Sequence, residues 1–319
     1  MTQEHTAARP VVHARDMTMT YGDTDVLHGV DLDIHRGEVF ALLGPNGAGK
    51  TTTVEILEGF RRRSGGEVSV LGADPERGDD TWRGRIGLVL QSWRDHGRWR
   101  VAELLGHFAE YYPDPRDPAE LLALVGLSEQ AGRQVDRLSG GQRRRLDVAL
   151  GIVGRPELLF LDEPTAGFDP EARHEFHLLV ERLARAEGVT VLLTTHDLVE
   201  AERLADRIAM LVGGRIRACG TPAELARRAA ARAEVRWTAD DGTSRRERTA
   251  DPSRLVWELH RHANGPIADL EVRRPTLEDT YLHMVRQEAD GTHGGQNEHR
   301  DRDGDGDEDA GADGEARVA

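Results

Sequence analysis

A single lysine, Lys50, stands in a glycine-rich run whose residue types suit phosphate binding. The run reads Gly-Pro-Asn-Gly-Ala-Gly-Lys-Thr over residues 44–51 and fits the pattern G-x-x-x-x-G-K-[ST] between a strand and a helix. Glycines let successive backbone N–H groups converge on phosphate oxygens, and the positive end of the following helix dipole favours that charge. The lysine would reach the β and γ phosphates, and the Thr51 hydroxyl would bind Mg²⁺. The run therefore predicts a nucleotide-binding loop.

Two carboxylates follow an apolar run later in the chain. Residues 157–163 read Glu-Leu-Leu-Phe-Leu-Asp-Glu, so Asp162 and Glu163 come where the predicted strand ends. Side chains at the carboxyl end of such a strand face the crevice in which α/β folds bind ligands. One acid can hold Mg²⁺ and the other can polarise water. Beside a phosphate loop, the pair predicts hydrolysis of the bound nucleotide.

A second run suited to phosphate binding begins at Leu138. Residues 138–142 read Leu-Ser-Gly-Gly-Gln and open a stretch with helical spacing. Backbone N–H groups and a helix N-terminus could therefore bind phosphate here as well. Because this run follows a helical insert, the two phosphate sites need not meet within one chain. They could meet across a dimer.

The elements that must position these residues follow from hydrophobic periodicity. Strands are predicted at 12–17, 30–34, 39–43, 157–161 and 189–193. Helices are predicted from Lys50 onward and at 101–112, 118–125, 142–153, 171–186 and 198–205. Strands that alternate with helices are typical of α/β sheets. The fold class predicted is α/β, a P-loop NTPase (RecA-like) core with a β-rich antiparallel part and an inserted helical subdomain at about 92–153.

The texture of the sequence changes after Thr221. A helix at 222–232, strands at 233–238 and 267–272, a helix capped by Asp251 and a last helix opened by Thr276 are predicted. The ATPase domain is thus placed at 11–225 and a small α+β domain at 226–286. Residues 287–319 contain almost no apolar side chains, so a disordered acidic tail is expected.

Composition excludes several classes of function. A formal net charge of −15 argues against an extended nucleic-acid interface, which needs a basic face. No apolar run approaches the length of about 18 residues that spans a bilayer, and the first ten residues do not resemble a secretory signal. The sequence therefore predicts a soluble, cytoplasmic protein. His174 and His177 lack a third ligand for zinc and are interpreted as residues of a solvated helix.

In order and spacing, the phosphate loop, the Leu-Ser-Gly-Gly-Gln run, the carboxylate strand and Thr-Thr-His-Asp at 194–197 resemble an ABC-transporter ATPase subunit. The resemblance covers roughly residues 11–222. It implies a head-to-tail dimer, in which each ATP lies between the phosphate loop of one subunit and the Leu-Ser-Gly-Gly-Gln run of the other. Phe168 stands where leucine is common in the family's dimer-contact loop.

The resemblance also implies roles for individual residues. Asp162 would hold Mg²⁺ with Thr51 and Gln91, and Gln91 would also face the membrane partner. Glu163 would be the base that activates water, and His196 would sense the γ-phosphate. Tyr21 would stack on adenine. The full set expected to contact ATP is Tyr21, Gly44, Pro45, Asn46, Gly47, Ala48, Gly49, Lys50, Thr51 and Thr52 of one subunit, with Ser139, Gly140, Gly141 and Gln142 of the other.

The predicted function is that of an ATP-hydrolysing subunit that works on a separate integral-membrane permease. It would lie in the cytoplasm, peripheral to the inner face of the cell membrane. The segment Arg-Pro-Thr-Leu-Glu-Asp-Thr-Tyr-Leu at 274–282 resembles the ATPases of daunorubicin-resistance type exporters, which favours export of a drug, antibiotic or other hydrophobic compound. An importer ATPase, an ABC ATPase acting on ribosomes or DNA, and a regulatory module that only clamps on ATP remain as alternatives.

Overall fold

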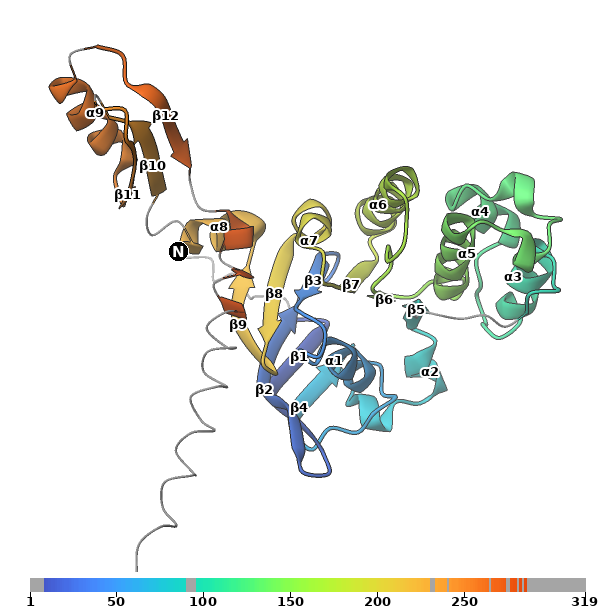
Figure 1. Cartoon of the computed structure of the whole chain (residues 1–319). Coiled ribbons are helices and arrows are strands. Elements are labelled where there is room, and N and C mark those ends of the chain that lie inside the picture. The colour runs from blue at the N-terminus through green and yellow to red at the C-terminus, as the bar shows by residue number, and fades with distance from the viewer. Residues whose placement is uncertain are drawn as a thin grey trace, which may run out of the picture.

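A six-stranded sheet forms the centre of the computed structural model (Figure 1). The structure describes residues 9–89, 96–229, 233–239, 241–263, 265–273, 276–279, 281–282 and 284–285. The strand order is β5 (Ile86–Val89), β6 (Leu158–Asp162), β7 (Thr190–Thr195), β3 (Val39–Leu43), β8 (Arg207–Val212) and β9 (Arg215–Gly220). Neighbouring strands are parallel except for β8 and β9, which pair antiparallel.

Both faces of this sheet are covered, which explains why its strands are apolar along their whole length. Successive side chains of a strand point to opposite faces, and β3 shows the result. Val39, Ala41 and Leu43 pack into one hydrophobic core, and Phe40 and Leu42 pack into another. Each face of the sheet therefore has a core of its own.

The first core lies between the sheet and helices, and the second lies between the sheet and a smaller antiparallel sheet (Figure 1). Helices α5 (Gly140–Ile152), α6 (Pro170–Arg185) and α7 (Leu198–Leu204) supply the first core. The second core contains α1 (Lys50–Leu57) and the strands β2 (Thr24–Ile34), β1 (Val12–Tyr21) and β4 (Gly65–Val70), which pair in that order.

Three helices form a separate lobe between β5 and β6 (Figure 1). They are α3 (Val101–Ala109), α4 (Pro118–Leu124) and α5. Leu104, Leu121 and Leu146, one from each helix, are fully buried together. Short elements complete this half of the chain: α2 (Asp80–Arg83) and 3₁₀ turns at Pro75–Arg77, Ser128–Gln130 and Val135–Arg137.

The C-terminal part begins with α8 (Pro222–Ala229) and continues with a three-stranded antiparallel sheet. Its order is β11 (Ser244–Thr249), β10 (Ala233–Thr238) and β12 (Ala268–Arg273), and α9 (Pro252–His262) contacts β10. In Figure 1 this unit projects from the rest of the molecule. The chain then returns to the helix-covered core, where Leu277 is buried and Tyr281 and Met284 pack beside it.

The predicted fold class is confirmed, and the predicted strands at 39–43, 157–161 and 189–193 correspond to β3, β6 and β7 of the central sheet. β3 and β10 have the predicted bounds. The predicted strand at 12–17 is the first part of the longer β1, and the one at 30–34 is the last part of the longer β2. The sequence reading did not find β4, β8, β9 and β11. The predicted tail at 287–319 lies outside the described residues. Among the helices that the structure describes, none has the length and apolar character that a membrane crossing requires.

Candidate nucleotide site

The phosphate loop connects the buried end of β3 with the first residue of α1. Gly49 caps α1 with φ of 99°, and a Cβ at this position would lie 2.6 Å from the Leu27 side chain. Glycine is therefore required both by the backbone and by the close approach of β2. Among the described residues no side chain caps the start of this helix. The N–H groups of its first turn can serve an anion instead.

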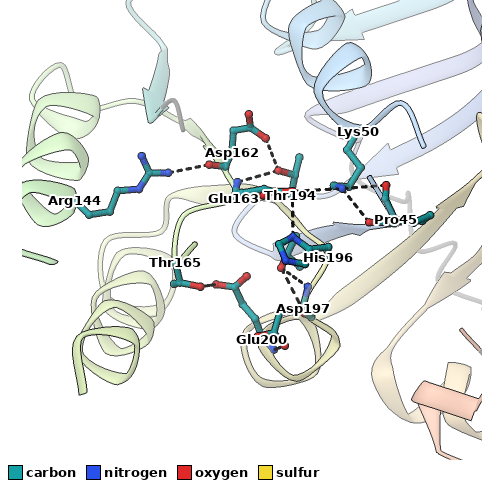
Figure 2. Close-up of polar contacts among 12 residues, drawn as sticks. Pro45, Lys50, Arg144, Asp162, Glu163, Thr165, Thr194, His196, Asp197 and Glu200 are labelled. Carbon is teal, nitrogen blue, oxygen red and sulfur yellow. Dashed lines mark hydrogen bonds and ion pairs between the residues drawn. The ribbon is translucent and has the colours of Figure 1, made fainter. Parts of the chain in front are cut away.

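The ammonium group of Lys50 lies over the loop and close to the end of β6 (Figure 2). Its Nζ donates to the carbonyl oxygens of Gly44, at 2.9 Å, and Pro45, at 3.3 Å. The same atom lies 3.5 Å from Oε1 of Glu163, and the lysine side chain is only 5% exposed. A buried cation is thus held by carbonyls and one carboxylate, which is an arrangement that phosphate oxygens can replace.

Asp162 and Glu163 are fixed at the carboxyl end of β6 by the neighbouring strand. Thr194 of β7 pairs with Asp162 in the parallel register. Its hydroxyl donates to Oδ1 of Asp162 at 2.6 Å and accepts the backbone N–H of Glu163 at 3.0 Å. The backbone of Glu163 has φ of 41°, a left-handed conformation that is unusual for a residue with a side chain. Such strain is typical of functional sites.

His196 completes the group at the end of β7. Its Nδ1 lies 3.3 Å from Oε1 of Glu163, and its side chain is 55% exposed. The structure thus brings together four of the side chains that sequence reasoning selected: Lys50, Asp162, Glu163 and His196 (Figure 2). A carboxylate between a cation and an imidazole, at the end of a phosphate loop, can orient and deprotonate a water molecule.

The second phosphate-binding run occupies the N-terminus of α5. Ser139 is the N-cap, and it forms a capping box with Gln142: the Ser139 hydroxyl accepts the N–H of Gln142, and the Gln142 side chain accepts the N–H of Ser139. Ser139 and Gly140 are exposed. Within the described ranges no hydrogen bond joins Ser139 or Gln142 to Lys50. The two phosphate-binding segments are both built, and polar contacts do not connect them within one chain.

The remaining candidate residues lie around the loop, with one exception. Asn46, Gly47 and Thr51 are exposed, Pro45 and Thr52 are half-buried, and Ala48 is buried. Gln91, expected at the metal and at the membrane partner, lies outside the described residues.

Tyr21 ends β1 and is 38% exposed. The guanidinium of Arg61 lies 4.9 Å from the centre of its ring, and this arginine also donates to Glu55 at 2.6 Å. A cation over an aromatic ring is a favourable pair. Arg61, which no sequence motif indicated, therefore lies over the ring that is expected to stack on adenine.

The structure adds residues that support the site from behind. Arg144 of α5 donates to the carbonyl oxygens of Asp162, at 2.9 Å, and Pro164, at 3.0 Å. Burial lowers the pKa of this guanidinium, and nearby carboxylates oppose that effect. Thr165 and Glu200 form a buried hydrogen bond of 2.6 Å. Sequence motifs could not reveal these contacts, because each contact joins two residues that are distant in the sequence.

The expectation for His177 was wrong. It was placed on a solvated helix face, but its side chain is 3% exposed in the first core, whereas His174 of the same helix pairs with Arg203 at the surface. The buried stripe of α6 includes Phe176, Leu179 and Val180, and position 177 falls within its width.

Fold and site together define a P-loop ATPase, and three comparisons specify the family. The ABC transporter family model matches residues 27–166. Nod factor export ATP-binding protein I of Cupriavidus pinatubonensis is 43% identical over 228 residues, which cover 69% of either chain. Daunorubicin resistance ATP-binding protein DrrA3 of Streptomyces coeruleorubidus is 37% identical over 298 residues, 83% of this chain and 92% of that protein.

The solved structures include a dimeric post-hydrolysis state of the ATP-binding cassette MJ0796 bound to ADP and Pi. It is 25% identical, matches with a TM-score of 0.59, and covers 66% of this chain and 98% of its own. The chain belongs to the ABC transporter family, as an ATP-binding subunit that hydrolyses ATP.

Proposed function

We propose that two copies of this chain close head to tail around two ATP molecules and drive a separate membrane permease that exports a drug, antibiotic or other hydrophobic compound. The observation that carries the dimer is the division of the site. One chain holds a phosphate loop with Lys50, Glu163 and His196 at its edge, and presents Ser139 and Gly140 exposed at the start of another helix. A second copy can supply the missing half.

The phosphate loop would bind the nucleotide first. Lys50 exchanges its contacts with Gly44 and Pro45 for oxygens of the β and γ phosphates, while the N–H groups at the start of α1 surround them. Tyr21 would stack on adenine. Ser139, Gly140 and Gly141 of the partner would then close on the γ-phosphate, which would exclude water from that side of the site.

Residues at the start of α1 and at the end of β6 suit Mg²⁺. Thr51 offers a hydroxyl and Asp162 a carboxylate, both hard oxygen ligands, and Gln91 would add an amide oxygen. In the described part of the chain no group of three His, Cys, Asp or Glu side chains could hold a metal alone. Bound there, Mg²⁺ would neutralise charge on the phosphate oxygens.

Glu163 would activate the attacking water. Its Oε1 already lies between the Lys50 ammonium and the His196 imidazole. When the lysine turns to phosphate, this carboxylate is left to accept a proton from water, and His196 can donate to the γ-phosphate. Positioning of this kind supplies most of the catalysis in phosphoryl transfer.

The dimer is tested by trapping it. Glu163→Gln should slow hydrolysis and leave ATP binding intact, so that Mg-ATP converts the variant from monomer to dimer on size exclusion. The matched control is Glu163→Gln combined with Ser139→Arg, which places a bulky side chain in the second phosphate site. The double variant should bind ATP and remain monomeric. A single variant that stays monomeric in saturating ATP would contradict the proposal.

Export is supported by the relatives, whose names include Nod factor export and daunorubicin resistance. It would place the chain in the cytoplasm, on the inner face of the membrane that holds the permease. Affinity purification of the full chain from membranes of the cells that naturally produce it should recover one permease. Recovery of a permease that works with a solute-binding protein would indicate import instead, and recovery of ribosomes or DNA would reject transport.

A further inference from the structure

A buried polar cluster lies behind the catalytic edge and joins three elements. The hydroxyl of Thr165 donates to Oε1 of Glu200 at 2.6 Å, and the same carboxylate oxygen lies 3.7 Å from Nε2 of His177. The exposed fractions are 4% for Thr165, 2% for Glu200 and 3% for His177. Neither ring nitrogen of the histidine has a hydrogen-bond partner in the described structure. Three polar side chains are thus withdrawn from water together.

The Thr165–Glu200 hydrogen bond ties together the segments that carry Glu163 and His196 (Figure 2). Thr165 comes two residues after Glu163, and Glu200 lies in the first turn of α7, four residues after His196. The Thr165–Glu200 bond therefore spans the gap between these segments on the side away from the phosphate loop. Arg144 holds the backbone of the same segment through the carbonyls of Asp162 and Pro164.

Burying three polar side chains lowers the stability of the folded state unless they pair with one another. A carboxylate without water needs hydrogen bonds or a cation, and an unpaired one is strongly destabilising. Glu200 has a hydroxyl and an imidazole as neighbours, and a leucine would fill the same space without such a need. Buried polar pairs impose one geometry, because each partner must stay in place. Here the fixed geometry is the separation between the segment after Glu163 and the helix after His196.

We infer that Glu200 is a positioning residue for ATP hydrolysis: its buried carboxylate holds the segment after Glu163 and the helix after His196 at one separation. Glu163 and His196 meet at 3.3 Å only while these two segments keep that separation. The hydrogen bond from the Thr165 side chain goes to Glu200 and not to the phosphate loop. The inference rests on the proposed roles of Glu163 and His196 in hydrolysis and does not depend on export.

The first experiment measures turnover and nucleotide binding in the purified full chain. Thr165→Val removes the donated hydrogen bond at nearly constant volume, and Thr165→Ser keeps the hydroxyl as the matched control. Because a displacement of about 1 Å at a reacting group can cost about a hundredfold, Thr165→Val should lower kcat by about tenfold or more, with KM for ATP changed by less than about twofold. Thr165→Ser should keep most of the wild-type kcat. An unchanged kcat in Thr165→Val, or an equal fall in both variants, would overturn the inference.

A double-mutant cycle separates positioning from general loss of stability. Glu200→Gln keeps the volume and removes the charge, so it should also lower kcat. If the two residues act through one bond, Thr165→Val combined with Glu200→Gln should be no slower than the worse single variant. Effects on kcat that multiply would show that the residues act separately, and the inference would fail.

Discussion

The central six-stranded sheet and the C-terminal three-stranded sheet differ in how far they are buried. In the six-stranded sheet, β3 and β7 consist only of buried residues. In the three-stranded C-terminal sheet, five of the six residues of β11 and of β12 are exposed, and α9 has no buried residue. One sheet has a core on each face, and the other shows most of its surface to solvent.

The difference reflects what each sheet must hold. Phosphoryl transfer depends on positioning, so the roles proposed for Lys50, Glu163 and His196 require strand and helix ends that do not move relative to one another. Close packing on both faces provides this. The C-terminal sheet carries none of the proposed catalytic residues. Its unit is joined to the buried part through α8 and through Leu277, which returns the chain to the helix-covered core.

The largest contrast between the regions should come from removing a cation from each. Lys50→Ala removes the buried ammonium of the phosphate loop and should lower ATP turnover by about a hundredfold or more, because charge on the phosphates is no longer balanced. The control is Arg261→Ala, which removes a cation stacked at 4.7 Å on Trp257 in the C-terminal unit. Its turnover should match that of wild type. Steady-state hydrolysis of Mg-ATP measures both, and equal losses would erase the contrast.

Leu277 tests where the C-terminal chain is needed. This leucine is 1% exposed in the first core, whereas Val272 in β12 is 42% exposed. Leu277→Ala leaves a cavity and should lower the free energy of unfolding by about 2–4 kcal/mol. Val272→Ala removes an exposed side chain and should change it by less than about 0.5 kcal/mol. Urea denaturation of the full chain distinguishes them. Similar values would mean that the two regions do not differ in packing.

A smaller effect concerns Glu58, which follows α1 at the edge of the ATPase core and is 8% exposed. Burial, with the negative charges of Asp162 and Glu55, raises its pKa to about 8. The folded state therefore retains a proton that the unfolded state releases. Stability from this group is fully present below the unfolded pKa and is lost as the pH rises through the folded pKa.

Wild-type stability should consequently fall by roughly 1–2 kcal/mol between pH 6 and pH 7.5 because of this group alone. The glutamine of Glu58→Gln has no proton to lose. The free energy of unfolding of this variant should therefore rise relative to that of wild type between pH 6 and pH 7.5. Urea denaturation at both pH values, with EDTA and without nucleotide, measures the change. A constant difference between the two proteins would show that Glu58 is ionised throughout.

The buried part of the fold was easier to predict than the exposed part, for a physical reason. β3 has five apolar residues followed by a motif whose backbone geometry is set by glycines, so residues 39–43 were assigned with the observed bounds. β11 reads Ser-Arg-Arg-Glu-Arg-Thr and has no apolar face. β11 forms because it pairs with the edge of β10. The residues of β11 themselves give no sign of that pairing.

In the site, too, contacts between distant segments were harder to predict than residues at strand ends. Asp162, Glu163 and His196 lie at or just after the ends of two strands, Lys50 follows a third strand through the phosphate loop, and parallel strands bring such ends together. Glu200 and His177 meet from two helices, and their neighbours in sequence do not show this. The periodicity of α6 indicated a buried face, but it did not show that a histidine on that face would meet a carboxylate from α7.

The smallest effect is expected from the end of the chain. Residues 287–319 contain eleven acidic residues and three arginines, and account for much of the net charge of −15. Few apolar side chains are present there to pack on either sheet, and charges separated by more than about 10 Å are screened at moderate salt. A chain ending at residue 286 should therefore keep the kcat, KM and Tm of the full chain in 0.15 M salt. A change in kcat that disappears at high salt would instead show that the acidic segment acts electrostatically on the ATPase core, and the contrast between a self-sufficient core and a dispensable end would fail.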